Sequence, residues 1–205
     1  MKKNKTSKNW IRDQYKDQFV KKSKIQGYRS RSAFKLLEIN KKFNFIKSNS
    51  LLLDLGSSPG GWSQVSSEKI KKGKILAVDI KKMEKIYNVN FIQGDFYENQ
   101  VYKKIITFFE KKIDIVISDM AANTTGNKSL DSDKTGELCL KAMDLATKIL
   151  NKNGSFLSKI FMGSIYKEIN DKAKKSFKKV TMHKPLSSKK TSKEIYIYCE
   201  GILNV

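Results

Sequence analysis

The chain has 205 residues, 39% of them hydrophobic, and carries 42 basic and 20 acidic residues for a net charge of +22. This length suits one ordinary domain with a sizeable core. No apolar run approaches the roughly 20 residues of a membrane-spanning helix, and no apolar stretch of a secretory signal follows the basic start. We therefore expect a single cytoplasmic domain over residues 1–205, without membrane contact.

Cysteine and histidine are scarce. Cys139 and Cys199 offer neither a zinc cluster nor a disulfide framework. The single histidine, His183, leaves little room for histidine-based triads or metal sites. We expect no metal ion, and a chemistry that uses Lys, Asp and Glu side chains.

Positive charge is concentrated near the N-terminus. Residues 1–50 hold 15 basic and 3 acidic residues, including all three arginines of the chain, Arg12, Arg29 and Arg31. A merely lysine-rich surface is the alternative, because lysine is abundant throughout. The clustering favours a polyanionic partner, and nucleic acid above all.

The N-terminal region predicts a basic arm and two helices. Residues 1–9 are expected to be a disordered arm. Over residues 10–24, apolar side chains recur at helical spacing: Trp10, Ile11, Tyr15, Phe19 and Val20. GYRSRSAFKLLEINKKF (27–43) predicts a second helix with Ser30 or Ser32 as its N-cap. Basic helices over 10–45 would thus precede a catalytic core over 50–205.

From residue 50 onward the hydrophobic period changes. Short apolar runs, each ending near a Gly or an Asp, alternate with helical segments such as TGELCLKAMDLATKIL (135–150). The runs are SLLLDLG (50–56), KILAVDI (74–80), VNFIQGD (89–95), IDIVISDM (113–120) and GSFLSKIF (154–161). This alternation predicts an α/β fold whose mostly parallel sheet is covered by helices on both faces.

The last part of the chain has a different pattern. FKKVTMHK (177–184) and EIYIYCEGIL (194–203) read as strands, and only a polar loop joins them. Two strands joined without a helix predict an antiparallel strand near the end of the sheet.

Glycine and aspartate residues mark a candidate ligand site, because ligands of open α/β sheets bind beyond the carboxyl ends of the strands. LLLDLGSSPGGW (51–62) leads a strand through Gly56 and Gly60 into a helix, and glycine lets the backbone approach a ligand closely. The spacing of its glycines is not G-x-G-x-x-G, so it does not match the dinucleotide-binding fingerprint. Asp79 could accept hydrogen bonds from two ribose hydroxyls, and Asp95 could bind an adenine amino group. Together they predict an adenosine-type cofactor.

Asp119 ends the fourth predicted strand, in ISDMAAN. Methyltransferases that modify amino groups often have an Asn/Asp-Pro-Pro-aromatic run here, which stacks on a planar amine. The Met-Ala-Ala of this chain provides nothing planar. A cytosine carbon-5 reaction would need a cysteine nucleophile near this loop. Cys139 lies in a predicted helix and Cys199 in the last strand, so neither reaction is expected.

Lys159 interrupts the apolar strand GSFLSKIFMG (154–163). A lysine at the mouth of a strand can extend its ammonium group into water. The alternative is a lysine kept near neutral by burial and by a second cation, and so able to accept a proton. Lys35 has an apolar helical neighbourhood of its own. Asp119 and Glu194 could complete a square of alternating charge, suited to deprotonating a weakly acidic hydroxyl.

These stretches together resemble the FtsJ (RrmJ) family of ribose 2′-O-methyltransferases, from about residue 10 to residue 202. The motifs that carry the resemblance are GYRSRSAFKLLEI, LLDLGSSPGGWSQV, FIQGDF, ISDMAAN, GSFLSKIF and KPLSSKKTSKEIYI. The resemblance implies the class I fold of S-adenosylmethionine-dependent methyltransferases: a Rossmann-like, seven-stranded, mostly parallel sheet with one antiparallel strand and helices on both faces. It also implies a substrate. Bacterial members of this short type methylate the ribose of a uridine in the A-loop of 23S rRNA, and they act on the assembled large ribosomal subunit.

The resemblance also implies site residues. The catalytic Lys-Asp-Lys-Glu tetrad of the family falls on Lys35, Asp119, Lys159 and Glu194. The S-adenosylmethionine site falls on Gly56, Pro59, Gly60, Trp62, Asp79, Asp95 and Asp119. In this scheme Lys159 is the general base for the 2′-hydroxyl, Asp119 orients it, and Lys35 and Glu194 position the hydroxyl.

The RNA contacts expected from charge clustering are Arg29, Arg31, Lys189 and Lys190. Ala122 stands where the family usually has proline, which leaves the catalytic groups in place. SSKKTSK has lysines in place of arginines. A lysine binds phosphate as a point charge and lacks the bidentate fork of arginine, so the RNA affinity would be less geometrically specific. We expect a monomer. The alternatives that stay open are a tRNA or another RNA as substrate, and a non-catalytic RNA-binding assembly factor.

Overall fold

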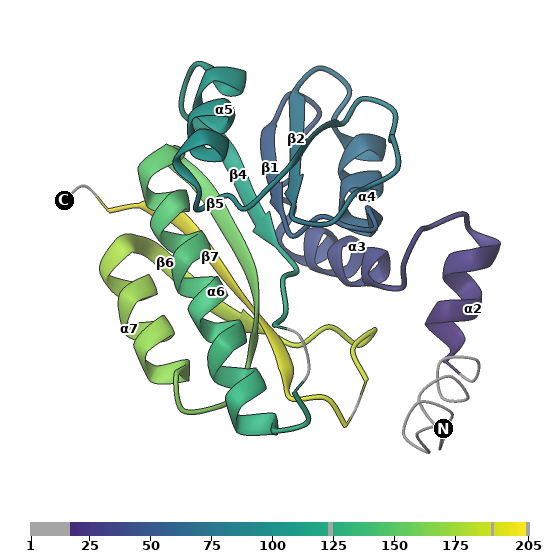
Figure 1. Cartoon of the computed structure of the whole chain (residues 1–205), viewed down its shortest axis with the longest axis vertical. Helices are drawn as coiled ribbons and strands as arrows, with labels where there is room; N and C mark the ends of the chain where they lie inside the picture. The colour runs from purple at the N-terminus through teal and green to yellow at the C-terminus, as the bar shows by residue number, and fades with distance from the viewer. Residues whose placement is uncertain (1–16, 123–124, 190, 204–205) are drawn as a thin grey trace.

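The computed structural model describes residues 17–122, 125–189 and 191–203. The predicted arm and the first half of the predicted helix over 10–24 lie outside these ranges. The second half forms α2 (Gln18–Ile25), where the side chain of Asp17 accepts a hydrogen bond from Phe19 N at 2.9 Å and caps the helix. Figure 1 shows α2 set apart from the sheet, on the N-terminal side of α3 (Ser32–Phe43).

Within the described residues, seven strands form one sheet in the order β3-β2-β1-β4-β5-β7-β6. The strands are β1 (Leu51–Leu55), β2 (Lys74–Asp79), β3 (Asn90–Gln93), β4 (Ile113–Ser118), β5 (Leu150–Phe161), β6 (Phe177–His183) and β7 (Glu194–Ile202). β1 to β5 pair in parallel, and β7 lies antiparallel between β5 and β6. The predicted mostly parallel sheet with one antiparallel strand is therefore confirmed.

Two element boundaries differ from the sequence prediction. The helix predicted from residue 135 is the second half of α6 (Lys128–Ile149), which the side chain of Asn127 caps. β5 begins at Leu150 and not at residue 154. In the described part of the chain, no helix is both long and apolar enough to cross a membrane.

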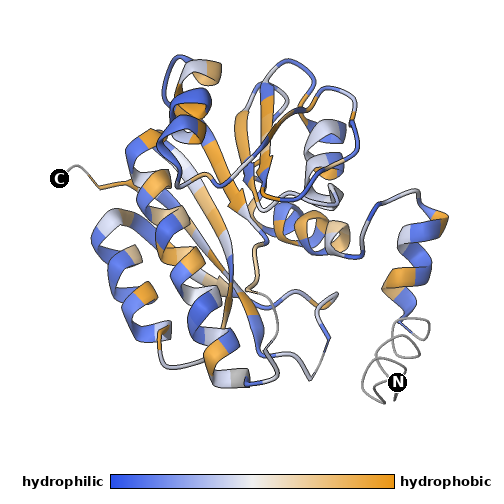
Figure 2. Ribbon diagram, in the orientation of Figure 1, coloured by the Kyte–Doolittle hydropathy of each residue, from blue (hydrophilic) through white to orange (hydrophobic). Residues whose placement is uncertain are grey.

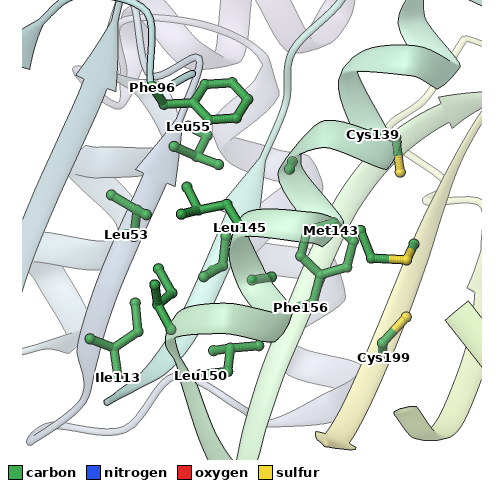
Figure 3. Packing of buried hydrophobic residues seen from close by; sticks show 14 of the residues in the cluster. Leu53, Leu55, Phe96, Ile113, Cys139, Met143, Leu145, Leu150, Phe156 and Cys199 are labelled. Carbon is green, nitrogen blue, oxygen red and sulfur yellow. The ribbon is translucent and has the colours of Figure 1, made fainter. Parts of the chain in front are cut away.

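The two faces of the sheet carry separate apolar cores. Leu53 and Phe156 belong to the core under α5 (Asn99–Phe109), α6 and α7 (Tyr166–Ser176), shown in Figure 3. Leu52 and Leu157, one position away, belong to the core under α3 and α4 (Gly61–Lys69). Successive side chains of a strand point to opposite faces, so strands covered by helices on both sides are apolar over most of their length, as the orange of β1, β2 and β4 in Figure 2 shows.

The predicted serine N-cap of α3 is wrong. The N-cap is Arg31, whose backbone is already in the right-handed helical region, and no side chain caps the helix. The hydroxyl groups of Ser30 and Ser32 lie 2.7 Å apart and hydrogen-bond to each other. The first-turn N–H groups of Ala33 and Phe34 donate to the backbone oxygens of Ser30 and Arg31 instead, each at 3.3 Å.

Phe156 lies at the centre of the sheet, fully buried, with its ring 6.0 Å from that of Phe177. We expect Phe156→Ala to lower the free energy of unfolding by about 3–5 kcal/mol, because the deletion leaves a cavity in the core under α5, α6 and α7. Urea denaturation measures this loss. Ile106→Ala, at a position 41% exposed on α5, is the control and should cost less than about 1 kcal/mol. A loss of the same small size for Phe156→Ala would contradict the packing described here.

Candidate active site

A cavity of about 250 Å³ lies at the carboxyl ends of β1 to β4. Its lining includes Gly56, Ser58, Asp79, Asp95, Phe96, Asp119 and Met120. The carboxyl ends of parallel strands share one edge of the sheet, which is why acidic residues far apart in the sequence meet here. The edge predicted from the Gly and Asp pattern is thus where the cavity lies.

Gly56 allows the loops after β1 and β4 to approach closely. Its φ of 71° lies in the left-handed region, and a Cβ there would come within 2.1 Å of Met120 Cγ. Both the conformation and the space require glycine. The close approach forms one wall of the cavity.

Asp79 and Asp95 hold the turns around the cavity. Asp79 accepts hydrogen bonds from Ser58 N at 2.9 Å and Lys81 N at 2.7 Å. Asp95 accepts one from Tyr97 N at 2.9 Å. A carboxylate offers about four acceptor positions, so each group can cap its turn and still accept a hydrogen bond from a ligand.

Asp54, at the end region of β1, is an unusually buried carboxyl group. Its Oδ2 accepts a hydrogen bond from Ser63 Oγ at 2.6 Å, whereas its Oδ1 is buried and lacks a partner among the described residues. Burial raises the pKa of Asp54 to about 7 despite this hydrogen bond, and the charges of Asp119 and Asp79 add to the rise.

The four residues of the predicted tetrad form two buried ion pairs. Lys159 Nζ lies 3.1 Å from Asp119 Oδ1 and donates to the Asp119 backbone oxygen at 2.6 Å. Lys35 Nζ lies 2.7 Å and 2.8 Å from the two carboxylate oxygens of Glu194. Both lysines are only 8% exposed. Lys159 therefore does not extend into water, which was the alternative for a lysine in this strand.

Tyr196 connects the two ion pairs. Its hydroxyl donates to Asp119 Oδ1 at 2.8 Å, and its ring lies 5.8 Å from Lys35 Nζ. Burial and the carboxylates of Asp119 and Glu194 raise the pKa of Tyr196 well above 10, so the hydroxyl keeps its proton. Sequence reasoning missed this residue. The signal was present, since Tyr196 follows Glu194 by two positions in a strand and shares its face.

Asp119 is the charge that both lysines share. Burial alone would raise its pKa, but the charges of Lys159 and Lys35 and the hydrogen bond from Tyr196 outweigh burial and lower it. Asp119 is therefore held as a carboxylate at the point where the tetrad meets the cavity.

The sequence of this chain is similar to those of known methyltransferases. The sequence model of the FtsJ-like methyltransferases matches residues 28–202. A "Ribosomal RNA large subunit methyltransferase E" from Pelagibacter ubique (strain HTCC1062) is 48% identical over 200 residues, 98% of either chain. A relative of the same name from Rickettsia akari (strain Hartford) is 45% identical over 94% of this chain and 87% of its own. The chain belongs to the FtsJ-like methyltransferase family.

Solved structures agree with this membership. A crystal structure from Plasmodium falciparum, described as a ribosomal RNA methyltransferase, has a TM-score of 0.79 and 36% identity, covering 87% of this chain and 100% of its own. A Streptococcus mutans methyltransferase structure in complex with SAH has a TM-score of 0.53, but its 15% identity shows the shared fold alone. The class I methyltransferase fold inferred from the family resemblance is confirmed.

Three residues that the FtsJ resemblance assigns to the cofactor lie outside the cavity lining. Pro59 and Gly60 belong to the loop after β1. Trp62 is buried, donates from Nε1 to Ser32 O at 2.9 Å, and has its ring 5.7 Å from that of Tyr196. Trp62 thus packs against Tyr196, which contacts the tetrad. Its contact with a cofactor stays a prediction.

The arginines predicted to contact RNA make intramolecular contacts. The Arg29 guanidinium donates to the backbone oxygens of Pro59, Glu84 and Lys85 at 2.6–3.2 Å. Arg31 pairs with Asp17 and donates to Ser187 O. Lys189 is exposed, and Lys190 lies outside the described residues. RNA contact by these four residues stays a prediction. The intramolecular contacts of the two arginines had no signal in the sequence.

Both cysteines are buried, and burial raises the pKa of Cys139 to about 12 and that of Cys199 further. Neither is placed as a nucleophile. Across the residues that the structure describes, no three His, Cys, Asp or Glu side chains are grouped to hold a metal ion.

The raised pKa of Asp54 predicts a pH-dependent stability difference. Below the unfolded-state pKa of about 3.9 the group is protonated in both states, and above about 7 it is ionised in both. The stability of the wild type relative to Asp54→Asn should therefore fall by a few kcal/mol as the pH rises between these values, then stay level. Urea unfolding from about pH 5 to pH 8 measures this difference, with the exposed Asp171→Asn as control. A difference independent of pH would contradict the assignment.

Proposed function

We propose that this chain uses S-adenosylmethionine to methylate the 2′-hydroxyl of a uridine in the A-loop of 23S rRNA, acting on the large ribosomal subunit. The observation that carries the proposal is the pair of buried ion pairs beside a cavity lined by carboxylates. The printed name of its relatives, and their identity over nearly the whole chain, support ribosomal RNA as the substrate.

The cavity residues fit S-adenosylmethionine. Asp79 would accept hydrogen bonds from the ribose hydroxyls, and Asp95 would bind the adenine amino group. The ionised Asp119 in the lining favours a cationic ligand in this region. When bound, S-adenosylmethionine supplies a methyl group already activated by its sulfonium charge.

The tetrad would carry the proton transfer. Lys159, as the neutral amine, would accept the proton of the 2′-hydroxyl at Nζ as the ribose oxygen forms its bond to the methyl carbon. The bond from that carbon to the sulfonium sulfur would break at the same time, and the sulfur would leave as a neutral thioether. Asp119, ion-paired with Lys159 and held by Tyr196, stabilises the ammonium group produced. Lys35 and Glu194, paired with each other, would orient the hydroxyl group.

Positioning accounts for most of the acceleration in this scheme. Because the methyl group is activated before the reaction, the main contribution of the chain is to hold the hydroxyl in line with it. The buried pairs suit this task, since a tetrad contributed by α3, the loop after β4, β5 and β7 is fixed by the packing of four separate elements. General-base catalysis adds roughly 10²–10⁴-fold.

Lys159→Ala should therefore lower methyl transfer roughly 10²–10⁴-fold, because the hydroxyl loses its base. The measurement is transfer from labelled S-adenosylmethionine to intact large subunits. Lys152→Ala, at an exposed position of the same strand, is the matched control and should keep wild-type activity. A loss below tenfold in a folded Lys159→Ala protein would exclude Lys159 as the base.

The substrate is tested by offering the wild type intact large subunits, free rRNA and bulk tRNA. Primer extension at low nucleotide concentration maps the 2′-O-methyl group. Modification of one A-loop uridine on subunits is the expected result. Modification of tRNA alone would contradict the proposed substrate, and binding to subunits without transfer to any RNA would favour an assembly factor.

A further inference from the structure

The charged face of α3 holds the loop that leads into β7. Lys35 and Glu38 lie three positions apart and so share one face of the helix, and Arg31 precedes Lys35 by one turn. Arg31 donates to Ser187 O, and Lys35 pairs with Glu194. Glu38, like Arg31, has no part in the proposed chemistry.

Glu38 makes three hydrogen bonds to this loop. Its Oε1 accepts from Leu186 N at 2.7 Å, and its Oε2 accepts from Ser187 N at 3.1 Å and Ser187 Oγ at 3.2 Å. A bond from Ser188 N to Pro185 O, at 3.0 Å, closes the turn. Both carboxylate oxygens therefore face donors.

Packing of Leu186 does not explain why the turn is held. The side chain of Leu186 is 89% exposed, so its burial contributes almost nothing. The polar contacts from Glu38 and Arg31 are what ties the backbone of the turn to α3. Because charged groups hold a turn whose tip, Leu186, is exposed, we infer that the position of the turn matters for the site.

The turn leads directly to the tetrad. Ser188 is buried, and its hydroxyl donates to Glu194 Oε1 at 2.9 Å. Glu194 is thus fixed from two directions, by Lys35 from α3 and by Ser188 from the turn. A turn displaced from Glu38 would withdraw the contact that Ser188 makes with Glu194.

We propose that Glu38 is a positioning residue: its carboxylate fixes the turn at 185–188 so that Ser188 holds Glu194 in the geometry needed by the 2′-hydroxyl. This role rests on the proposed function. It requires a carboxylate, because the amide of glutamine would place an NH₂ group against a backbone N–H whichever way it is turned. Ser188 is the link through which Glu38 acts.

The first test does not depend on activity. Hydrogen exchange of the Leu186 and Ser187 amides is compared between the wild type and Glu38→Gln. Loss of a charge-assisted acceptor should speed exchange about tenfold or more at these two amides. Glu168→Gln, at an exposed position of α7, is the matched control and should leave them unchanged. Equal exchange in Glu38→Gln and the wild type would overturn the proposal.

The second test is a double-mutant cycle on large subunits with Glu38→Gln and Ser188→Ala. Each should lower kcat/KM about tenfold while leaving S-adenosylmethionine affinity and the melting temperature near wild type. Because both act through one contact, the double variant should be no worse than the worse single variant. Losses that multiply would show that Glu38 acts by another route.

The two tests separate the inference from the function on which it rests. Absence of methyl transfer by the wild type would contradict the proposed function, whereas the exchange comparison would still decide whether Glu38 holds the turn. An active wild type with an equally active Glu38→Gln variant would overturn the positioning role alone.

Discussion

The cost of burying charge governs the structure of this site. Removing an ammonium or a carboxylate from water costs several kcal/mol per ion unless close partners compensate. The charge of Lys159 is compensated by both the carboxylate and the backbone oxygen of Asp119. Tyr196 donates a hydrogen bond to the same carboxylate. These partners meet because β5 pairs with β4 on one side and with β7 on the other, which places Lys159 directly opposite Tyr196. The sheet order thus makes a buried lysine tolerable.

The same constraint divides the carboxyl groups into two kinds. Asp119 has two lysines nearby and is held ionised, whereas burial, together with the charges of Asp119 and Asp79, raises the pKa of Asp54 despite its serine partner. Like charges at one strand edge oppose each other until a cation arrives. On the proposed function, the sulfonium charge of the cofactor relieves this repulsion. Cofactor binding and the charge state of the strand edge are then coupled.

Most of the fold, and the residues of the tetrad, could be predicted from the sequence. Strands buried on both faces appear as apolar runs, and the Gly and Asp residues that end them mark the ligand edge. The tetrad came from resemblance to a family, since no local pattern brings Lys35 near Glu194. Tyr196 could have been found from the strand face that it shares with Glu194. Contacts that depend on tertiary placement were not predictable: Glu38 and the arginines contact residues far away in the sequence. The serine cap failed for a local reason, because two neighbouring hydroxyl groups paired with each other.

The contacts of the arginines change how the basic N-terminal region relates to RNA. A guanidinium presents several donors in a planar fork, which suits backbone oxygens as well as phosphates. Arg29 uses its fork on three backbone oxygens, and Arg31 uses its own on Asp17 and Ser187. Among the residues described here, lysines then carry the charge left for phosphates, and lysine binds them as a point charge. Under the proposed function, selection of one nucleotide therefore depends on the fixed geometry of the tetrad and its supporting turn, and phosphate contacts contribute attraction.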